Sequence, residues 1–378
     1  VWHNQEAIRA LLKDIAESEK DTKPMRQPFE LYQRLAGICV DGFVNDTKHK
    51  WEYKQFSEKV KGKCLEMVRK PNKMSMQWRG LYWDMLLAET YEFFESFIYY
   101  MEMKRPYDKK FYEPRNMTLD VVVKDLQDLE DGKYKFYGLS MPSRVGKSTV
   151  CIFFLAWIAL RRPNSHSAMG GHSGILARGF YKELMNLITT EEYTFGDMYE
   201  YWHRDLPMLT DKSADELTIT LGDADRFATL TCRGIDGTWT GAIDISSDGY
   251  LYVDDLVRDR AHSLSPTRME DTFAEYLNKM VDRMNTGAKQ LMVGTLWNVL
   301  DPLMRLEEMY GDREDYLFRR IPALNDKDES NFNYDIKGFT TQYYRDMRDM
   351  LVKAGNEAEW MAKFQQRPYV REGLLFPL

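Results

Sequence analysis

The residues of this sequence best suited to chemistry lie between an apolar run and a helical pattern, at Arg144-Val-Gly-Lys-Ser148. The preceding run, Lys135–Met141, has the composition of a strand, and after Lys147 no Gly or Pro occurs until Pro163. A loop between a strand and a helix directs backbone N–H groups and the helix N-terminus at one point, where an anion is stabilised. This order therefore predicts a site for the phosphates of a nucleotide.

The residues of this loop have individual expected roles. Lys147 would reach the β- and γ-phosphates of a bound triphosphate, and the Ser148 hydroxyl would hold Mg²⁺. The residues expected to surround the phosphates are Pro142, Ser143, Arg144, Val145, Gly146, Lys147, Ser148 and Thr149. Met141 stands where the usual pattern has its first glycine, so the match is incomplete, and a chance junction of loop and helix is the competing interpretation.

A pair of carboxylates follows a second apolar strand, Tyr250–Val253. Beside a phosphate-binding loop, the first acid, Asp254, would hold the Mg²⁺ shell directly or through water. The second acid, Asp255, would orient and deprotonate the attacking water. An ordinary acidic turn after a strand is the alternative, and the predicted loop favours the catalytic interpretation.

A third strand, Leu291–Val293, ends in Gly294 and Thr295. A small residue and a hydroxyl at this place could face the γ-phosphate from a neighbouring strand. The same dipeptide is common in turns, so it supports the site only together with the other two segments.

Composition restricts the class of protein. With 378 residues, 44% hydrophobic and 29% charged, the chain is typical of a globular protein that buries a substantial core. The net charge of −7 argues against a protein that grips DNA over its whole surface, so any DNA contact must come from local patches or from several subunits together.

The four cysteines are widely separated, which argues against zinc and disulfides and for a reducing cytoplasm. The longest uncharged apolar run, residues 150–160, is too short for a membrane span.

The periodicity of apolar residues changes along the chain. Residues 1–110 predict a helical region, with helices at 4–19, 30–44, 50–69 and 77–103. Residues 111–325 alternate strands (135–141, 164–171, 216–221, 227–232, 250–253, 291–293, 316–321) with helices (147–162, 175–188, 267–285, 303–310). This alternation predicts an α/β fold of the P-loop NTPase kind, with a mostly parallel central sheet flanked by helices and the site at its carboxyl edge. Residues 326–366 predict a small helical lid with a helix at 340–366, and 367–378 a linker.

Several short motifs in this order resemble the large terminase subunit of tailed bacteriophages, the ATPase motor that packages DNA. The motifs are Pro142–Ser148, with its arginine in the loop, Arg233–Gly241, Val253–Asp255, Gly294–Trp297, whose Gly294 and Thr295 would form the family's coupling motif, and Phe364–Pro368 followed by Glu372–Phe376. The resemblance covers about residues 111–378 and concerns the ATPase half of that family. Too few residues follow for the family's nuclease domain, so we expect a motor-domain fragment, or the ordered part of a longer protein, and no nuclease activity in these 378 residues.

The resemblance implies more than hydrolysis of ATP. It implies a homo-oligomeric ring, a pentamer in this family, that moves double-stranded DNA into a procapsid. Its partners would be the portal protein and the small terminase subunit, with no membrane, and its place the host cytoplasm, docked transiently on the procapsid. Arg144 could neutralise charge within its own site, and Arg115 lies where the family places residues close to adenine, although a surface turn explains Arg115 equally well.

A ring places an arginine of one subunit in the site of its neighbour. Arg233 is our candidate, because it follows a predicted strand and enters a loop with glycines at 234, 237 and 241. Pairing with Asp236 within the same chain is the alternative, and Arg178 is the next candidate.

Two other functions stay open at this stage. A phosphotransferase of the nucleoside-kinase type shares the loop and the sheet, but such enzymes have an acidic substrate motif soon after the loop helix, where this chain has Arg161-Arg-Pro163. A nucleotide-binding scaffold without hydrolysis is disfavoured by the presence of Lys147, Ser148, Asp254 and Asp255 together.

Overall fold

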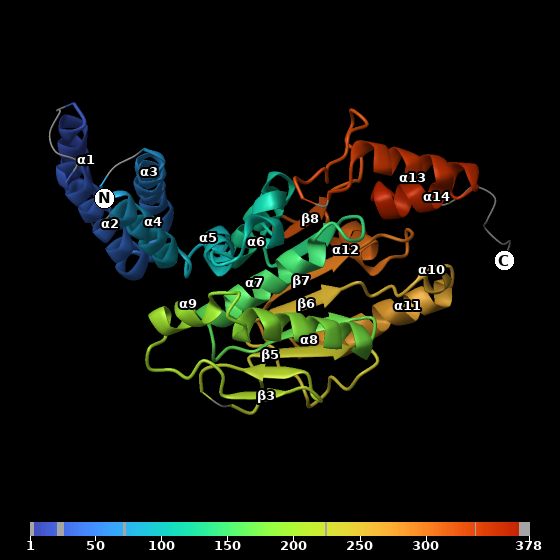
Figure 1. Cartoon of the computed structure of the whole chain (residues 1–378). Coiled ribbons are helices and arrows are strands. Elements are labelled where there is room, and N and C mark those ends of the chain that lie inside the picture. Colours follow the sequence, from blue (N-terminus) through green and yellow to red (C-terminus); the bar gives the residue numbers. More distant parts are fainter. Residues whose placement is uncertain (1–3, 21–25, 71–72, 224, 337, 370–378) are drawn as a thin grey trace. The chain divides into compact units, whose positions relative to one another are not determined.

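The computed structural model describes residues 4–20, 26–70, 73–223, 225–336 and 338–369. The chain divides into two compact units, Val1–Met103 and Lys104–Leu378 (Figure 1). The domain boundaries predicted at residues 110, 325 and 366 stay predictions. Residues 370–378 of the predicted linker, with the Glu372–Phe376 motif, lie outside the described part of the chain.

The first unit is helical. Its helices are α1 (Gln5–Ser18), α2 (Arg26–Asn45), α3 (Lys50–Arg69), α4 (Ser75–Glu89) and α5 (Phe94–Met101). The prediction of one helix over 77–103 is wrong, because the backbone is extended at Phe93 (φ −126°, ψ 117°). This extended residue lets the Phe93 ring pack edge-on against Phe43 and Trp51, so a tertiary contact outweighs helix propensity.

The second unit is built on one sheet of eight strands, in the order β3-β4-β5-β2-β6-β7-β1-β8. The strands are β1 (Phe136–Ser140), β2 (Ser167–Gly171), β3 (Asp211–Ser213), β4 (Thr218–Thr220), β5 (Leu230–Gly234), β6 (Tyr250–Asp254), β7 (Lys289–Gly294) and β8 (Tyr316–Arg320). In the sheet, the neighbouring strands β5, β2, β6, β7, β1 and β8 all pair parallel. The strands at the other edge, β3 with β4 and β4 with β5, pair antiparallel. The predicted mostly parallel sheet is therefore confirmed, including the hairpin of β4 and β5.

Helices flank this sheet (Figure 1). The helices of the second unit are α6 (Asn116–Glu130), α7 (Lys147–Arg161), α8 (Gly174–Thr189), α9 (Phe195–Trp202), α10 (Arg260–Ser263), α11 (Pro266–Glu275), α12 (Pro302–Tyr310), α13 (Thr341–Lys353) and α14 (Glu357–Glu359), of which α13 and α14 lie beyond the sheet. Two predicted helices are shorter than expected. The helix over 267–285 changes after Glu275 to a π-turn and a 3₁₀ turn, and the helix over 340–366 is interrupted at Gly355, which has a φ of +73°. Helices α6, α9 and α10 and strand β3 were not predicted.

Both faces of the central strands are covered, which explains their continuous apolar sequences. In β6, Leu251 and Val253 belong to the core formed with α11 and α12. The alternate residues Tyr250 and Tyr252 meet Phe154 of α7 and Phe180 of α8 on the other face. Among the described helices, none is long and apolar enough to cross a membrane.

Candidate nucleotide-binding site

The loop between β1 and α7 has an unusual backbone. Arg144 and Gly146 both have positive φ angles, 70° and 107°. The φ angle of Gly146 favours glycine, and a Cβ atom there would lie 3.0 Å from Cε2 of Phe111, which leaves little room for a side chain. Met141, in contrast, is fully buried, and its N–H donates to the Gly294 carbonyl at 3.4 Å. Position 141 therefore continues the strand pairing, which accounts for the missing first glycine.

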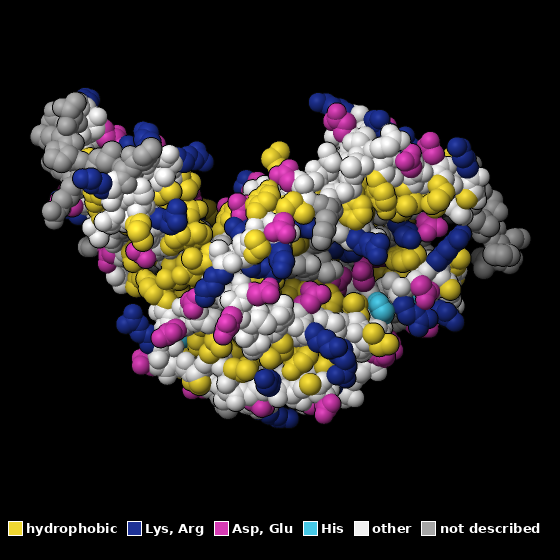
Figure 2. Space-filling view, viewed as in Figure 1, with side chains coloured by type: hydrophobic (Ala, Val, Ile, Leu, Met, Phe, Trp, Pro, Cys, Tyr) yellow, Lys and Arg dark blue, Asp and Glu magenta, His cyan; other side chains and the backbone are white. Residues whose placement is uncertain are grey.

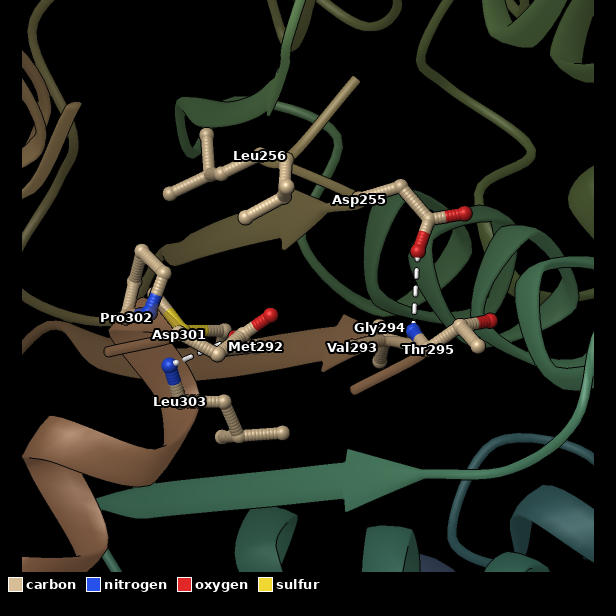
Figure 3. A pocket seen from close by; sticks show the side chains of 10 residues that line it. Asp255, Leu256, Met292, Val293, Gly294, Thr295, Asp301, Pro302 and Leu303 are labelled. Carbon is tan, nitrogen blue, oxygen red and sulfur yellow. Dashed lines mark hydrogen bonds between the residues drawn. The ribbon is translucent and has the colours of Figure 1, made fainter. Parts of the chain in front are cut away.

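Lys147, the first residue of α7, is buried and points at two other segments. Its Nζ donates to Thr295 Oγ1 at 3.0 Å and lies 3.5 Å from Asp255 Oδ2. The Thr295 N–H donates to Asp255 Oδ1 at 3.0 Å, as Figure 3 shows. The Thr295 hydroxyl also lies 3.3 Å from the Met141 carbonyl, to which it can donate. The three segments singled out in the sequence thus meet at one cluster, Lys147–Asp255–Thr295.

The strand order brings these residues together. Strand β7 lies between β1 and β6, and all three run parallel. In register, Ser140 pairs with Gly294, and Val293 pairs with Asp254, so the three strands end at the same level. Residues that follow parallel strands meet at the carboxyl edge of the sheet, where such folds bind ligands.

Asp254 is buried, with 1% of its surface exposed, and the Tyr252 hydroxyl donates to its Oδ2. Its Oδ1 has no hydrogen-bond partner among the described residues. Burial and the neighbouring charge of Asp255 raise the pKa of Asp254 to about 7, although Lys147 and Ser148 act in the opposite direction. An unpartnered carboxylate oxygen beside a hydroxyl fits the oxygen ligands that Mg²⁺ prefers. Ser148 and Asp254 could therefore hold this ion.

Asp255 differs from its neighbour, since its side chain is 35% exposed. Its backbone has a φ of 40°, and its N–H donates to the Val293 carbonyl at 3.0 Å. This conformation directs the carboxylate to Thr295 and Lys147 rather than along the strand. A carboxylate that is oriented by two donors and reachable by solvent is suited to accept a proton from water.

A third carboxylate, Asp301, lies behind Asp255 and was missed from the sequence. It caps α12, accepting the Leu303 N–H at 3.1 Å, and shares with Asp255 a cavity of about 10 Å³ (Figure 3). Burial, and to a smaller extent the charge of Asp255, raise the pKa of Asp301 to about 7. The sequence signal for it is Asp-Pro at a helix start, which indicates a cap and not a site.

The other predicted loop residues occupy different environments. Pro142 and Val145 are buried, Ser148 and Thr149 are half-buried, and Ser143 and Arg144 are exposed. The Val145 carbonyl accepts a hydrogen bond from the hydroxyl of Tyr334, 2.7 Å away. Tyr334, like Asp301, was not found from the sequence.

Arg115 lies beside the same loop. Its guanidinium is 5.4 Å from the ring centres of both Phe111 and Tyr334, and it donates to the Phe111 carbonyl at 2.8 Å. Phe111 packs on Gly146, and Tyr334 donates to the Val145 carbonyl. Arg115 is therefore linked to the loop backbone indirectly, through these two aromatic residues. The structure thus brings Arg115 close to the predicted phosphate site without direct contact to Lys147.

Arg233 and Arg178 lie apart from the Lys147 cluster. Arg233 is at the end of β5, two strands from β6, and its guanidinium is 3.3 Å from both the carbonyl and the carboxylate of Glu216. Arg178 donates to the Ala214 carbonyl at 2.9 Å. Both arginines line an open groove of about 490 Å³. They hold the turn between β3 and β4 rather than pairing with Asp236.

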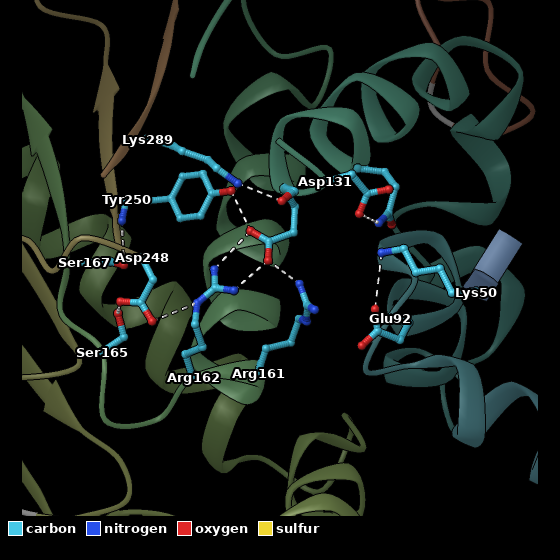
Figure 4. A network of polar contacts seen from close by, with 12 residues as sticks. Lys50, Glu92, Asp131, Arg161, Arg162, Ser165, Ser167, Asp248, Tyr250 and Lys289 are labelled. Carbon is cyan, nitrogen blue, oxygen red and sulfur yellow. Dashed lines mark hydrogen bonds and ion pairs between the residues drawn. The ribbon is translucent and has the colours of Figure 1, made fainter. Parts of the chain in front are cut away.

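The far ends of the site elements are tied together by one buried carboxylate. Glu130, at the end of α6, pairs with Arg161 and with Arg162 at 2.6 Å, and accepts the Tyr250 hydroxyl at 2.6 Å (Figure 4). The Glu130 carbonyl also accepts from Lys289 at 2.7 Å. These partners lie at the end of α7 and the starts of β6 and β7, whose opposite ends carry Lys147, Asp255 and Thr295. We call this group the Glu130 anchor.

Charges elsewhere are mixed. On the face drawn in Figure 2, positive and negative side chains are interspersed, in keeping with the net charge of −7. Comparison of the sequence with models of known protein families gave no match, and comparison with curated proteins gave none either.

Proposed function

We propose that this protein is a P-loop ATPase, and that it acts as a subunit of a ring-shaped motor that moves double-stranded viral DNA into a procapsid. One observation carries the hydrolytic part. Lys147 and Thr295, 148 residues apart, meet at 3.0 Å, and Asp255 lies 3.5 Å from the same lysine. A lysine at a helix N-terminus, beside paired carboxylates and a hydroxyl, is the set of groups that phosphoryl transfer to water requires.

The chain's own groups have distinct tasks in this proposal. An entering polyphosphate would replace Asp255 and Thr295 as the partner of Lys147, which would then compensate the phosphate charge. Ser148 and Asp254 would hold Mg²⁺, which supplies charge neutralisation at the phosphates. Freed from Lys147, Asp255 would keep its hydrogen bond from the Thr295 N–H, and would orient the attacking water and take its proton.

The motor part rests on the order of the sequence motifs. A chain with a net charge of −7 does not attract DNA over its whole surface. In this proposal the DNA contacts come from local basic groups, and a ring of subunits brings several such groups around the same duplex. Arg144, which is exposed on the loop, would compensate phosphate charge within its own subunit. Arg233 could serve a neighbouring subunit only after releasing Glu216. The portal protein and the small terminase subunit would be partners on the procapsid, in the host cytoplasm.

The test is release of phosphate from Mg²⁺–ATP, with and without double-stranded DNA. We expect slow release by the protein alone and faster release with DNA. Lys147→Ala should abolish both rates, whereas Lys124→Ala, which removes an exposed lysine paired to Asp120, should change neither. Transfer of phosphate to an added nucleoside instead of water would favour the nucleoside-kinase alternative. ATP binding without any release or transfer would reject an enzymatic function.

A further inference from the structure

Tyr334 contacts the loop backbone at the Val145 carbonyl, between two residues that have positive φ angles. Val145 lies between Arg144 and Gly146, both with positive φ, a region that few residues other than glycine adopt. Glycine gives little resistance to rotation of the peptide before it. Something else must therefore keep the peptide between Val145 and Gly146 in one orientation.

The Tyr334 hydroxyl can do this. It donates to the Val145 carbonyl at 2.7 Å in a buried environment, where a hydrogen bond is not exchanged with water. Because the peptide unit is planar and trans, its carbonyl and its N–H point in opposite directions. Holding the Val145 carbonyl toward Tyr334 therefore holds the Gly146 N–H away from Tyr334. In the opposite orientation the carbonyl oxygen would take the place of that N–H donor and repel an anion.

The segment that carries Tyr334, residues 331–335, is held by contacts with other parts of the second unit. Thr118 donates to the Asn331 carbonyl at 2.5 Å, and Phe332 is fully buried. Tyr107 donates to the Asp335 carboxylate at 3.0 Å. Gly338 packs so closely that a Cβ there would lie 2.2 Å from the Tyr334 nitrogen. The Tyr334 hydroxyl thus reaches the loop from a segment that Thr118 and Tyr107 hold in place independently of the loop.

We infer that Tyr334 is a positioning residue for the phosphate site, which orients the Gly146 N–H toward the polyphosphate and links phosphate binding to the docking of residues 331–335. This inference rests on the proposed nucleotide site and adds a residue from outside its three segments. Coupling between two sites is reciprocal. Phosphate binding should therefore stabilise residues 331–335 to the same extent as their docking favours phosphate binding.

The test compares the full chain with Tyr334→Phe, which keeps the ring and removes only the hydroxyl. Calorimetric titration should show about fivefold weaker binding of Mg²⁺–ATP, the effect of one hydrogen bond. Inorganic tripolyphosphate, which has no base or sugar, should lose the same factor. In turnover the KM for ATP should rise with little change in kcat. Tyr199→Phe also loses one tyrosine hydroxyl bonded to a backbone carbonyl, that of Pro207 at 3.0 Å, but lies outside residues 142–149 and 331–335; it is the matched control and should bind both ligands as the wild type does.

Hydrogen–deuterium exchange of the unaltered protein gives a second measurement that needs no variant. Tripolyphosphate should slow exchange in residues 331–335 as well as in residues 142–149. Equal affinity of Tyr334→Phe and wild type, or loss of ATP affinity with unchanged tripolyphosphate affinity, would overturn the inference alone. If the wild type binds neither ligand, the proposed function falls with it.

Discussion

Glu130→Gln should lower the free energy of unfolding of the second unit by about 3 kcal/mol at pH 7. Burial alone would raise the pKa of Glu130, but hydrogen bonds and charge from Arg162 and Arg161 outweigh it and lower the pKa from 4.5 to about 2. Since each pKa unit corresponds to about 1.4 kcal/mol, the charged form is stabilised on folding by about 3 kcal/mol. The carboxylate side chain is 4% exposed, so water screens this interaction little.

The sign of the pH dependence follows from the lowered pKa. A carboxyl group that is more acidic in the folded state contributes its full stability above about pH 4.5 and loses it as the pH falls toward 2. The difference between wild type and Glu130→Gln should therefore shrink to about 1.4 kcal/mol at pH 3. Urea unfolding followed by hydrogen exchange in β6 measures this difference in the second unit.

Asp120→Asn on the same helix is the matched control. Its exposed pair with Lys124 spans 2.7 Å, and exposed pairs contribute little, so we expect a loss under about 0.5 kcal/mol. If both variants lose the same small amount, or if the Glu130→Gln difference grows as the pH falls, the reasoning about the Glu130 anchor is refuted.

Three further substitutions address the site. Asp255→Asn should keep binding of Mg²⁺–ATP yet lose at least about 100-fold in kcat, because an amide cannot accept the proton of water; single-turnover kinetics would measure this loss. Asp254→Asn should instead weaken the Mg²⁺-dependent part of nucleotide binding, seen by titration with and without the metal, and an exchange of these two phenotypes would reverse the assigned roles. Arg233→Ala should be inactive alone but regain hydrolysis when mixed with Lys147→Ala subunits, if Arg233 serves a neighbour. Persistent inactivity of the mixture, measured as phosphate release, would leave Arg233 as the residue that holds Glu216.

The elements of the site could be predicted because local signals define them. Strands β1, β6 and β7 are buried on both faces and read as short apolar runs, and Gly146 and Pro163 bracket α7. Helix α6 was missed because several of its polar side chains are buried and paired. Asp125, for example, accepts from Arg319 and Tyr137, so it breaks the apolar pattern without facing solvent.

Asp301 and Tyr334 could not be found in the same way. Asp301 has the sequence context of a helix cap, and only the neighbouring strand places it behind Asp255. Tyr334 is separated from Val145 by 189 residues, and no spacing rule connects them. The interruption at Phe93 likewise depends on rings from other helices. Contacts between distant segments decide these features, and local propensity does not contain them.

The left-handed backbone at Arg144 and Asp255 has a consequence for how this sequence can change. A residue with a side chain loses about 1 kcal/mol or more in this region, and glycine or asparagine tolerates it better. Directed evolution for thermal stability alone would therefore favour glycine or asparagine at position 144, and would gain less at position 255, because aspartate is itself enriched in this region. Selection that also required turnover would retain the charged side chains. Comparing the two selections would separate what the fold tolerates from what the chemistry demands.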